Sequence, residues 1–105
     1  MTVFNIYEHS IKLPKEPDFG AVCYRVNDVL NQLRKDHIID KVVNLKYYMS
    51  PITSNIDIIE DTKIYTFVMF DTASNDYIDI TCNYYNMQGL LDIRMDYYKV
   101  EEKDG

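Results

Sequence analysis

The residues best suited to chemistry in this chain are carboxylates, and they gather in its second half. Asp79 and Asp96 lie in two neighbouring segments with strand-like alternation, and two carboxylates that face each other can act as a general acid and base. An exposed, flat sheet face gives such a pair no cleft, so we expect no catalysis there. Asp57, Glu60 and Asp61 form a second acidic cluster, which lacks the further ligands that would predict a metal site.

Other kinds of active site find little support in the sequence. His9 and His37 are far apart and neither stands at metal-ligand spacing, and no serine or cysteine lies in a nucleophile motif. The chain has three glycines, Gly20, Gly89 and Gly105, which do not form a phosphate-binding loop. We therefore expect a protein that is not an enzyme and that has no catalytic residues, cofactor or metal.

A β-hairpin over residues 77–98 is expected to position the carboxylates. Residues 77–85 and 90–98 alternate apolar and polar side chains with period two, which is typical of half-buried strands. The turn falls at 86–89, where Gly89 can adopt positive φ. A loop of this length predicts a register in which every inward pair is apolar: Ile78 with Tyr97, Ile80 with Met95, Cys82 with Ile93, and Tyr84 with Leu91.

The outward face of this hairpin combines carboxylates with phenols. The same register places Asp79 opposite Asp96 and Tyr77 opposite Tyr98, and directly opposed like charges destabilise a sheet by roughly 0.2–1 kcal/mol. Two interpretations stay open: a solvated surface whose charges are screened, or a binding surface for a basic partner. The candidate partner-binding residues are Asp79, Asp92, Asp96, Tyr77, Tyr85 and Tyr98, with Asp57, Glu60 and Asp61 as a second patch.

The first third of the chain predicts a strand followed by a helix. Residues 3–11 alternate imperfectly and predict a first strand, and Pro14-Lys15-Glu16-Pro17 then breaks the chain. Asp18 is a candidate N-cap for an amphipathic helix that runs to Arg34 or a little beyond. Its apolar stripe, expected to pack on the sheet, consists of Phe19, Val22, Cys23, Val26, Val29, Leu30 and Leu33.

The middle of the chain predicts further strands. Residues 37–40 connect the helix to a strand at 42–49 that ends at Pro51. Residues 51–61 admit three interpretations: a short strand, a turn that covers a sheet edge, or a loop that packs on a partner. Residues 63–71 are apolar on both faces, which is typical of a strand covered on both sides. The second face would be covered by residues 51–61, by another copy of the chain, or by a partner. Residues 71–76 predict a turn.

Composition favours one domain over residues 1–105, with a polar tail at 101–105. The net charge is −6, and it is unevenly divided: residues 1–49 carry seven basic and six acidic side chains, whereas residues 50–105 carry four and eleven. This balance disfavours direct binding to nucleic acid and favours a basic protein partner, although charge also maintains solubility. Ten tyrosines without a tryptophan suit a sheet face or an interface.

Features of targeting and redox chemistry are consistent with a cytoplasmic protein. Cys23 and Cys82 fall on the predicted core faces, and two cysteines do not make a disulfide framework, so we expect both to be reduced. The sequence shows no signal peptide, no apolar run long enough to span a bilayer and no glycosylation sequon. We therefore expect no membrane association.

The order of strand, long helix and four strands resembles the cystatin-like arrangement, in which a meander wraps one helix. The Q-x-V-x-G type hairpin motif of that family is absent, so no protease-inhibitor residues carry over. The predicted fold class is α+β, with one long N-terminal helix on a four- to five-stranded antiparallel sheet in the order β-α-β-β-β-β.

In size, acidity and tyrosine content the chain is similar to the DNA-mimic inhibitors of phages and mobile elements. These include anti-CRISPR proteins, anti-restriction proteins and uracil-DNA glycosylase inhibitors. The similarity implies a non-enzymatic inhibitor that binds a basic, nucleic-acid-handling protein, with aspartates at phosphate sites and tyrosines at base-stacking positions. Two alternatives stay open: an immunity protein or antitoxin against a nuclease toxin, and a homo-oligomeric structural or accessory protein that buries the second face of residues 63–71.

Overall fold

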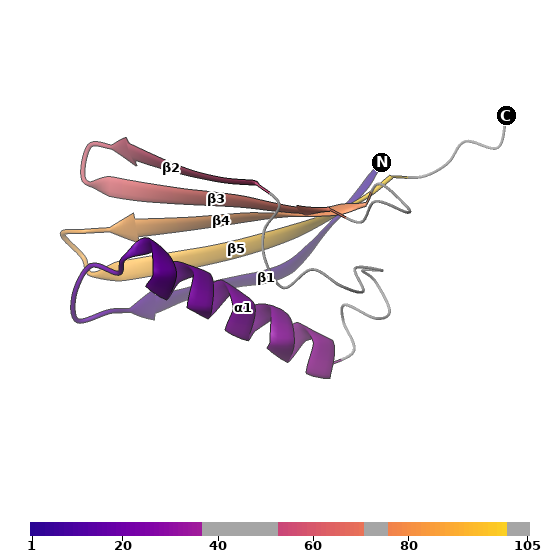
Figure 1. Ribbon diagram of the computed structural model, residues 1–105, viewed down its shortest axis with the longest axis horizontal. Helices are drawn as coiled ribbons and strands as arrows, with labels where there is room; N and C mark the ends of the chain where they lie inside the picture. The colour runs from indigo at the N-terminus through magenta and orange to yellow at the C-terminus, as the bar shows by residue number, and fades with distance from the viewer. Residues whose placement is uncertain (37–52, 71–75, 101–105) are drawn as a thin grey trace, which may run out of the picture.

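The computed structural model describes residues 1–36, 53–70 and 76–100, which form one helix and a five-stranded antiparallel sheet (Figure 1). The strand order is β1-β5-β4-β3-β2, and the predicted α+β class is confirmed. Along the chain the elements are β1 (Thr2–Lys12), α1 (Phe19–Lys35), β2 (Thr53–Ile59), β3 (Thr62–Phe70), β4 (Tyr77–Tyr85) and β5 (Leu90–Lys99).

The predicted β4–β5 hairpin is confirmed, including its register. Tyr77 pairs with Tyr98, Asp79 with Asp96, and each predicted inward pair occurs. Gly89 has a φ of 62° and donates its N–H to the Tyr85 carbonyl at 2.8 Å. A Cβ at this position would also lie 3.2 Å from the Leu13 carbonyl oxygen. Glycine therefore meets two local requirements: the left-handed backbone and the close approach of the chain that follows β1.

Helix α1 begins directly after Asp18, the predicted N-cap. Asp18 has extended backbone angles, and its Oδ1 accepts a hydrogen bond from the Ala21 amide at 2.7 Å. At the other end Arg34 and Lys35 lie in the last turn, where the helix dipole favours positive charge. The buried stripe consists of Val22, Val26, Leu30 and Leu33, so the helix presents one apolar face to the sheet.

One hydrophobic core lies between α1 and the face of the sheet that we call the inner face. In Figure 1 the helix lies across this face near β5 and β1. The sheet contributes alternate residues of its central strands: Tyr65, Phe67, Met69, Ile78, Ile80, Cys82, Tyr84, Leu91, Ile93, Met95 and Tyr97. Both cysteines are free thiols as expected. Burial, and secondarily Cys23, raises the pKa of the Cys82 thiol to about 12.

The two edge strands could not be placed from the sequence alone. β1, at one edge, pairs with β5 through a register that shifts between Asn5 and Tyr7. β2, at the other edge, pairs with β3 across the two-residue turn Glu60-Asp61. Of the three interpretations of residues 51–61, the strand is correct. Because β2 extends the sheet sideways, it does not form a layer over the second face of β3.

Several predicted segments lie outside the described residues. These are the 37–40 connector, the 42–49 strand, most of the 71–76 turn and the 101–105 tail. Among the residues that are described, no helix combines the length and the apolar character needed to cross a membrane.

Candidate functional site

The candidate site is the face of the sheet opposite α1, which we call the outer face. Directly paired residues of neighbouring strands point to the same side, so the registers identify its members. Asp79, Asp92 and Asp96 belong to it together with Tyr77, Tyr85 and Tyr98. The structure thus brings the six hairpin candidates onto one side. In the described part of the chain, no helix lies on this side.

Asp96 is a well-satisfied carboxylate. It accepts a hydrogen bond from Arg94 Nε at 2.9 Å and another from Asn5 Nδ2 at 3.0 Å. The Arg94 guanidinium also lies 4.0 Å from Glu8 Oε1. The hydrogen bond with Asp96 is the main reason that the pKa of Arg94 is raised. These contacts hold the Asp96 carboxylate directly opposite Asp79.

Asp79, by contrast, has no hydrogen bond or ion pair among the described residues. Its pKa is raised, first by desolvation and second by repulsion from Asp96. Val68, its neighbour on the other side in β3, is apolar and offers no compensating charge. The free protein therefore holds at Asp79 a partly buried carboxylate whose negative charge is unfavourable.

A pair of tyrosines lies next to the two carboxylates. The rings of Tyr77 and Tyr98 stack with centroids 4.6 Å apart and planes 10° from parallel. Desolvation, followed by the charges of Asp79 and Asp96, raises the pKa of Tyr98. The phenol therefore remains protonated at neutral pH and can donate a hydrogen bond. Stacked rings beside carboxylates form a surface that suits a cation.

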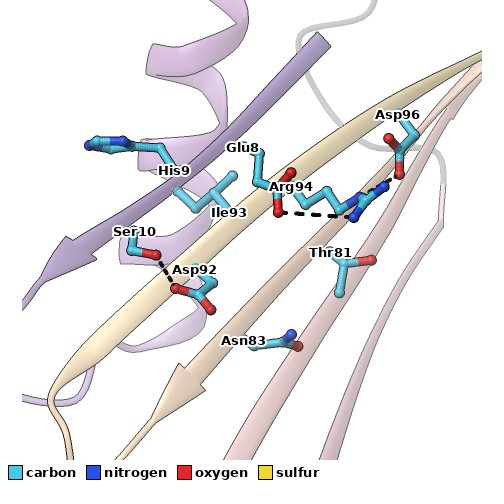
Figure 2. A pocket seen from close by; sticks show the side chains of 9 residues that line it. All are labelled: Glu8, His9, Ser10, Thr81, Asn83, Asp92, Ile93, Arg94 and Asp96. Carbon is cyan, nitrogen blue, oxygen red and sulfur yellow. Dashed lines mark hydrogen bonds and ion pairs between the residues drawn. The ribbon is translucent and has the colours of Figure 1, made fainter. Parts of the chain in front are cut away.

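A shallow hollow of about 710 Å³ lies over β1, β5 and β4 on this side. Figure 2 shows its residues: Asp92 accepts a hydrogen bond from Ser10 Oγ, and Arg94 lies between Glu8 and Asp96. Thr81 and Asn83 of β4 line the hollow as well, whereas the His9 side chain points away from the carboxylates. Three carboxylates thus border a polar depression that holds a single guanidinium.

The second predicted patch divides in two. Asp57 pairs with Ile64, which pairs with Asn83, and Asn83 pairs with Asp92, so Asp57 lies on the outer face with the hairpin carboxylates. Glu60 and Asp61 form the β2–β3 turn instead. Asp61 Oδ2 accepts from the Met87 amide at 2.8 Å and thereby joins this turn to the β4–β5 turn. Asp61 consequently has a structural role that sequence reasoning did not foresee.

Residues of β1 complete the outer face, and sequence reasoning missed them. Asn5, Glu8 and Ser10 lie opposite Asp96, Arg94 and Asp92. Only the pairing of β1 with β5 reveals this, because nothing in the first strand indicates which sheet edge it joins. Over the described residues the face holds Glu8, Asp57, Asp79, Asp92 and Asp96 against Lys12 and Arg94, a net charge of five minus two, or −3.

Comparison with protein-family models, with curated proteins and with solved structures finds no match to this chain. The cystatin-like arrangement is therefore a likeness in the order of elements along the chain alone, and no relative supports it. What the site can do must be inferred from its own residues. They are acceptors and aromatic rings on an open sheet face, an arrangement suited to contact with a cationic surface.

Proposed function

We propose that the protein is a non-enzymatic inhibitor that binds a basic, nucleic-acid-handling protein through the outer face. The observation that carries this proposal is Asp79. It lies opposite the fixed carboxylate of Asp96, has no cation of its own among the described residues, and has a raised pKa. A lysine or arginine from a partner would supply the missing charge, so binding would remove a repulsion that the free protein retains.

The tyrosines suit the same role. Tyr77 and Tyr98 are partly buried and offer their stacked rings beside the carboxylates. Tyrosine provides a large contact area with a polar end, and aromatic residues are enriched in protein interfaces. An arginine that reaches Asp79 could also lie against these rings. Together these groups would favour a partner whose binding surface is rich in arginine.

Arg94 constrains the charge pattern of the partner's binding surface. It separates Asp79 and Asp96 from Asp92 and Asp57, because it occupies the row between them in the register. A partner that contacts both pairs of aspartates would need two sets of basic side chains. Between them, opposite Arg94, it would need a neutral or acidic residue. This pattern is more specific than a uniformly positive groove, and it makes mimicry of a regular phosphate backbone incomplete.

The test is affinity capture from the organism of origin with two matched variants. Asp79→Lys reverses a charge on the outer face, and Asp28→Lys makes the same change on the exposed surface of α1. We expect the wild type and Asp28→Lys to capture one basic protein, and Asp79→Lys to lose it. Capture should weaken as salt is added. The purified wild type should then inhibit the nucleic-acid-dependent activity of the captured protein.

Three outcomes would contradict this function. Equal capture by both variants would mean that the outer face is only solvated surface. A captured protein whose nucleic-acid activity is unaffected would exclude inhibition. A stable homodimer disrupted by Asp79→Lys would assign the face to a second copy, although the net −3 charge on each face disfavours that pairing. A captured toxin encoded beside this chain would instead identify an immunity protein.

A further inference from the structure

The edge strand β2 has backbone groups that point away from the sheet. Ile59 and Thr62 flank the two-residue turn Glu60-Asp61 and are partners in the register. The pair that closes a two-residue hairpin turn is a hydrogen-bonded pair. Hydrogen-bonded and non-hydrogen-bonded pairs alternate along an antiparallel ladder. The amides of Ser54, Ile56 and Ile58 therefore face away from β3. The Ile58 amide agrees with this geometry, because it donates to Asp57 Oδ1, a side-chain acceptor of its own strand, at 3.0 Å.

The side chains at this edge are unusually apolar for a surface strand. Ile56, Ile58 and Ile59 are 44%, 67% and 56% exposed. The opposite edge strand, β1, carries the protections typical of sheet edges, namely an irregular register and the charges of Glu8 and Lys12. β2 pairs with β3 without a register shift. A regular edge strand with exposed isoleucines is a ready template for another strand.

We propose that β2 accepts an extended, basic segment of a partner protein as an additional strand of the sheet. Strand addition of this kind takes its affinity from main-chain hydrogen bonds and its specificity from alternate side chains. The seven residues of β2 match a segment of similar length. This site differs from the hairpin part of the outer face, so it goes beyond the function proposed above.

The negative charge of β2 and of the turn that follows it favours a basic segment over a second copy of β2. Residues 53–70 carry Asp57, Glu60 and Asp61 against the single cation Lys63, a net charge of −2. Lys63 is itself engaged by Glu16 at 3.9 Å. A second copy of β2 would bring the same carboxylates against the first set, which disfavours self-pairing. A basic segment would gain from the same charges.

The register also predicts the pattern of that segment. Residues opposite Ile56 and Ile58 would lie on the inner side of the sheet and should be apolar. A residue opposite Asp57 would lie on the outer side and should be lysine or arginine. An alternating sequence of basic and β-branched residues meets both conditions.

The probe is a synthetic nine-residue peptide of alternating lysine and valine with blocked ends, and the control replaces lysine with glutamate. Binding to the full chain is followed by the NMR shifts and the hydrogen exchange of the Ser54 and Ile56 amides. We expect the lysine peptide to slow exchange at these two amides by about tenfold or more at saturation. The glutamate peptide should leave both amides unchanged.

Two variants test the geometry and the charge separately. Ile56→Pro removes an outward donor without removing a β2–β3 hydrogen bond, so it should abolish peptide binding while the β3 amides stay protected. Asp57→Asn should weaken binding by about two- to fivefold, the size of a cross-strand charge pair. Asp28→Asn makes the same charge change on α1 and should have no effect.

Each other outcome overturns this proposal. Strong protection of Ser54 and Ile56 in the free monomer would mean that the chain itself already covers the edge. Protection that appears with protein concentration, together with a dimer in sedimentation, would assign the edge to a second copy. No protection with the lysine peptide, or equal protection with the glutamate peptide, would exclude a basic strand. None of these results depends on Asp79, so the function proposed for the hairpin face is tested independently.

Discussion

At the scale of single residues, Asp76 shows how a carboxylate can be structural, because among the described residues it is the one buried acidic side chain. It is 5% exposed, directly before β4. It accepts hydrogen bonds from the Tyr97 hydroxyl and from the Val100 amide, the latter at 2.9 Å. Asp76 therefore ties together the ends of β4 and β5 that lie away from their turn.

Asp76→Ala should lower the free energy of unfolding by about 1–3 kcal/mol, because it leaves the buried Tyr97 hydroxyl without this acceptor. Urea denaturation measures the loss. Tyr97→Phe introduced into Asp76→Ala should cost much less than Tyr97→Phe alone, since the two side chains share one interaction. Additive losses in the double variant would show that the hydrogen bond between them contributes little.

Asp79 should behave in the opposite way, because its charge is unfavourable in the folded state. Desolvation and then Asp96 raise its pKa above the ordinary 3.8. The folded protein thus binds this proton more tightly than the unfolded chain. The resulting destabilisation is absent below the ordinary pKa and complete above the raised one.

Asp79→Asn should therefore stabilise the free protein at pH 7 by roughly 0.2–1 kcal/mol, and this gain should vanish near pH 3. Urea titrations of both proteins at the two pH values provide the comparison. Asp28→Asn is the control, since Asp28 lies exposed on α1 away from the outer face. A gain that persists at low pH would point to packing or hydrogen bonding in place of charge. A variant that is more stable but loses the partner would separate function from stability.

At the scale of elements, local patterns predicted the parts of the fold that depend on local chemistry. The β4–β5 register followed from one turn and from alternation, and α1 followed from the cap Asp18 and a periodic apolar stripe. The pairing of β1 with β5 joins residues about ninety positions apart, as in the bond from Asn5 to Asp96, and no local signal encodes it. For this reason the sequence identified the aspartates of the site but not Glu8 or Ser10.

The β2–β3 turn contains a residue that does not suit its backbone. Glu60 has a φ of 55°, in a two-residue hairpin turn of the kind that favours glycine or asparagine at positive φ. The left-handed conformation costs an L-residue with a Cβ roughly 1–2 kcal/mol. Glycine adopts it without that penalty, although it also gives the unfolded chain more freedom.

Glu60→Gly should accordingly raise the free energy of unfolding by about 0.5–1 kcal/mol, with an unchanged dependence on urea concentration. The neighbouring Asp61→Gly is a matched control. It lacks the positive φ and removes the hydrogen bond from Met87, so it should destabilise the protein. If both variants lost stability equally, strain at Glu60 would not be the reason.

At the scale of the whole molecule, a single helix covers one side of the sheet in the described residues. The core is a single layer of side chains between α1 and the inner face. Helix and sheet should therefore depend on each other for stability, because neither can bury its apolar side chains alone. The outer face, in turn, can carry a net charge of −3 and an unpaired Asp79 without interrupting that core.

Leu30 tests this dependence. It is 1% exposed at the centre of the apolar stripe of α1, whereas Tyr24 on the same helix is 70% exposed. Leu30→Ala should lower the free energy of unfolding by about 2–5 kcal/mol through lost burial and the cavity left behind, whereas Tyr24→Ala should change it by no more than about 0.5 kcal/mol. Far-ultraviolet circular dichroism follows the helix, and tyrosine fluorescence follows the sheet, which holds seven of the eight tyrosines in the described residues. In Leu30→Ala the urea midpoints of both signals should fall by the same amount, because the helix and the sheet share one core. A helix signal that is lost first, while the tyrosine signal keeps its wild-type midpoint, would mean that the sheet is stable without α1.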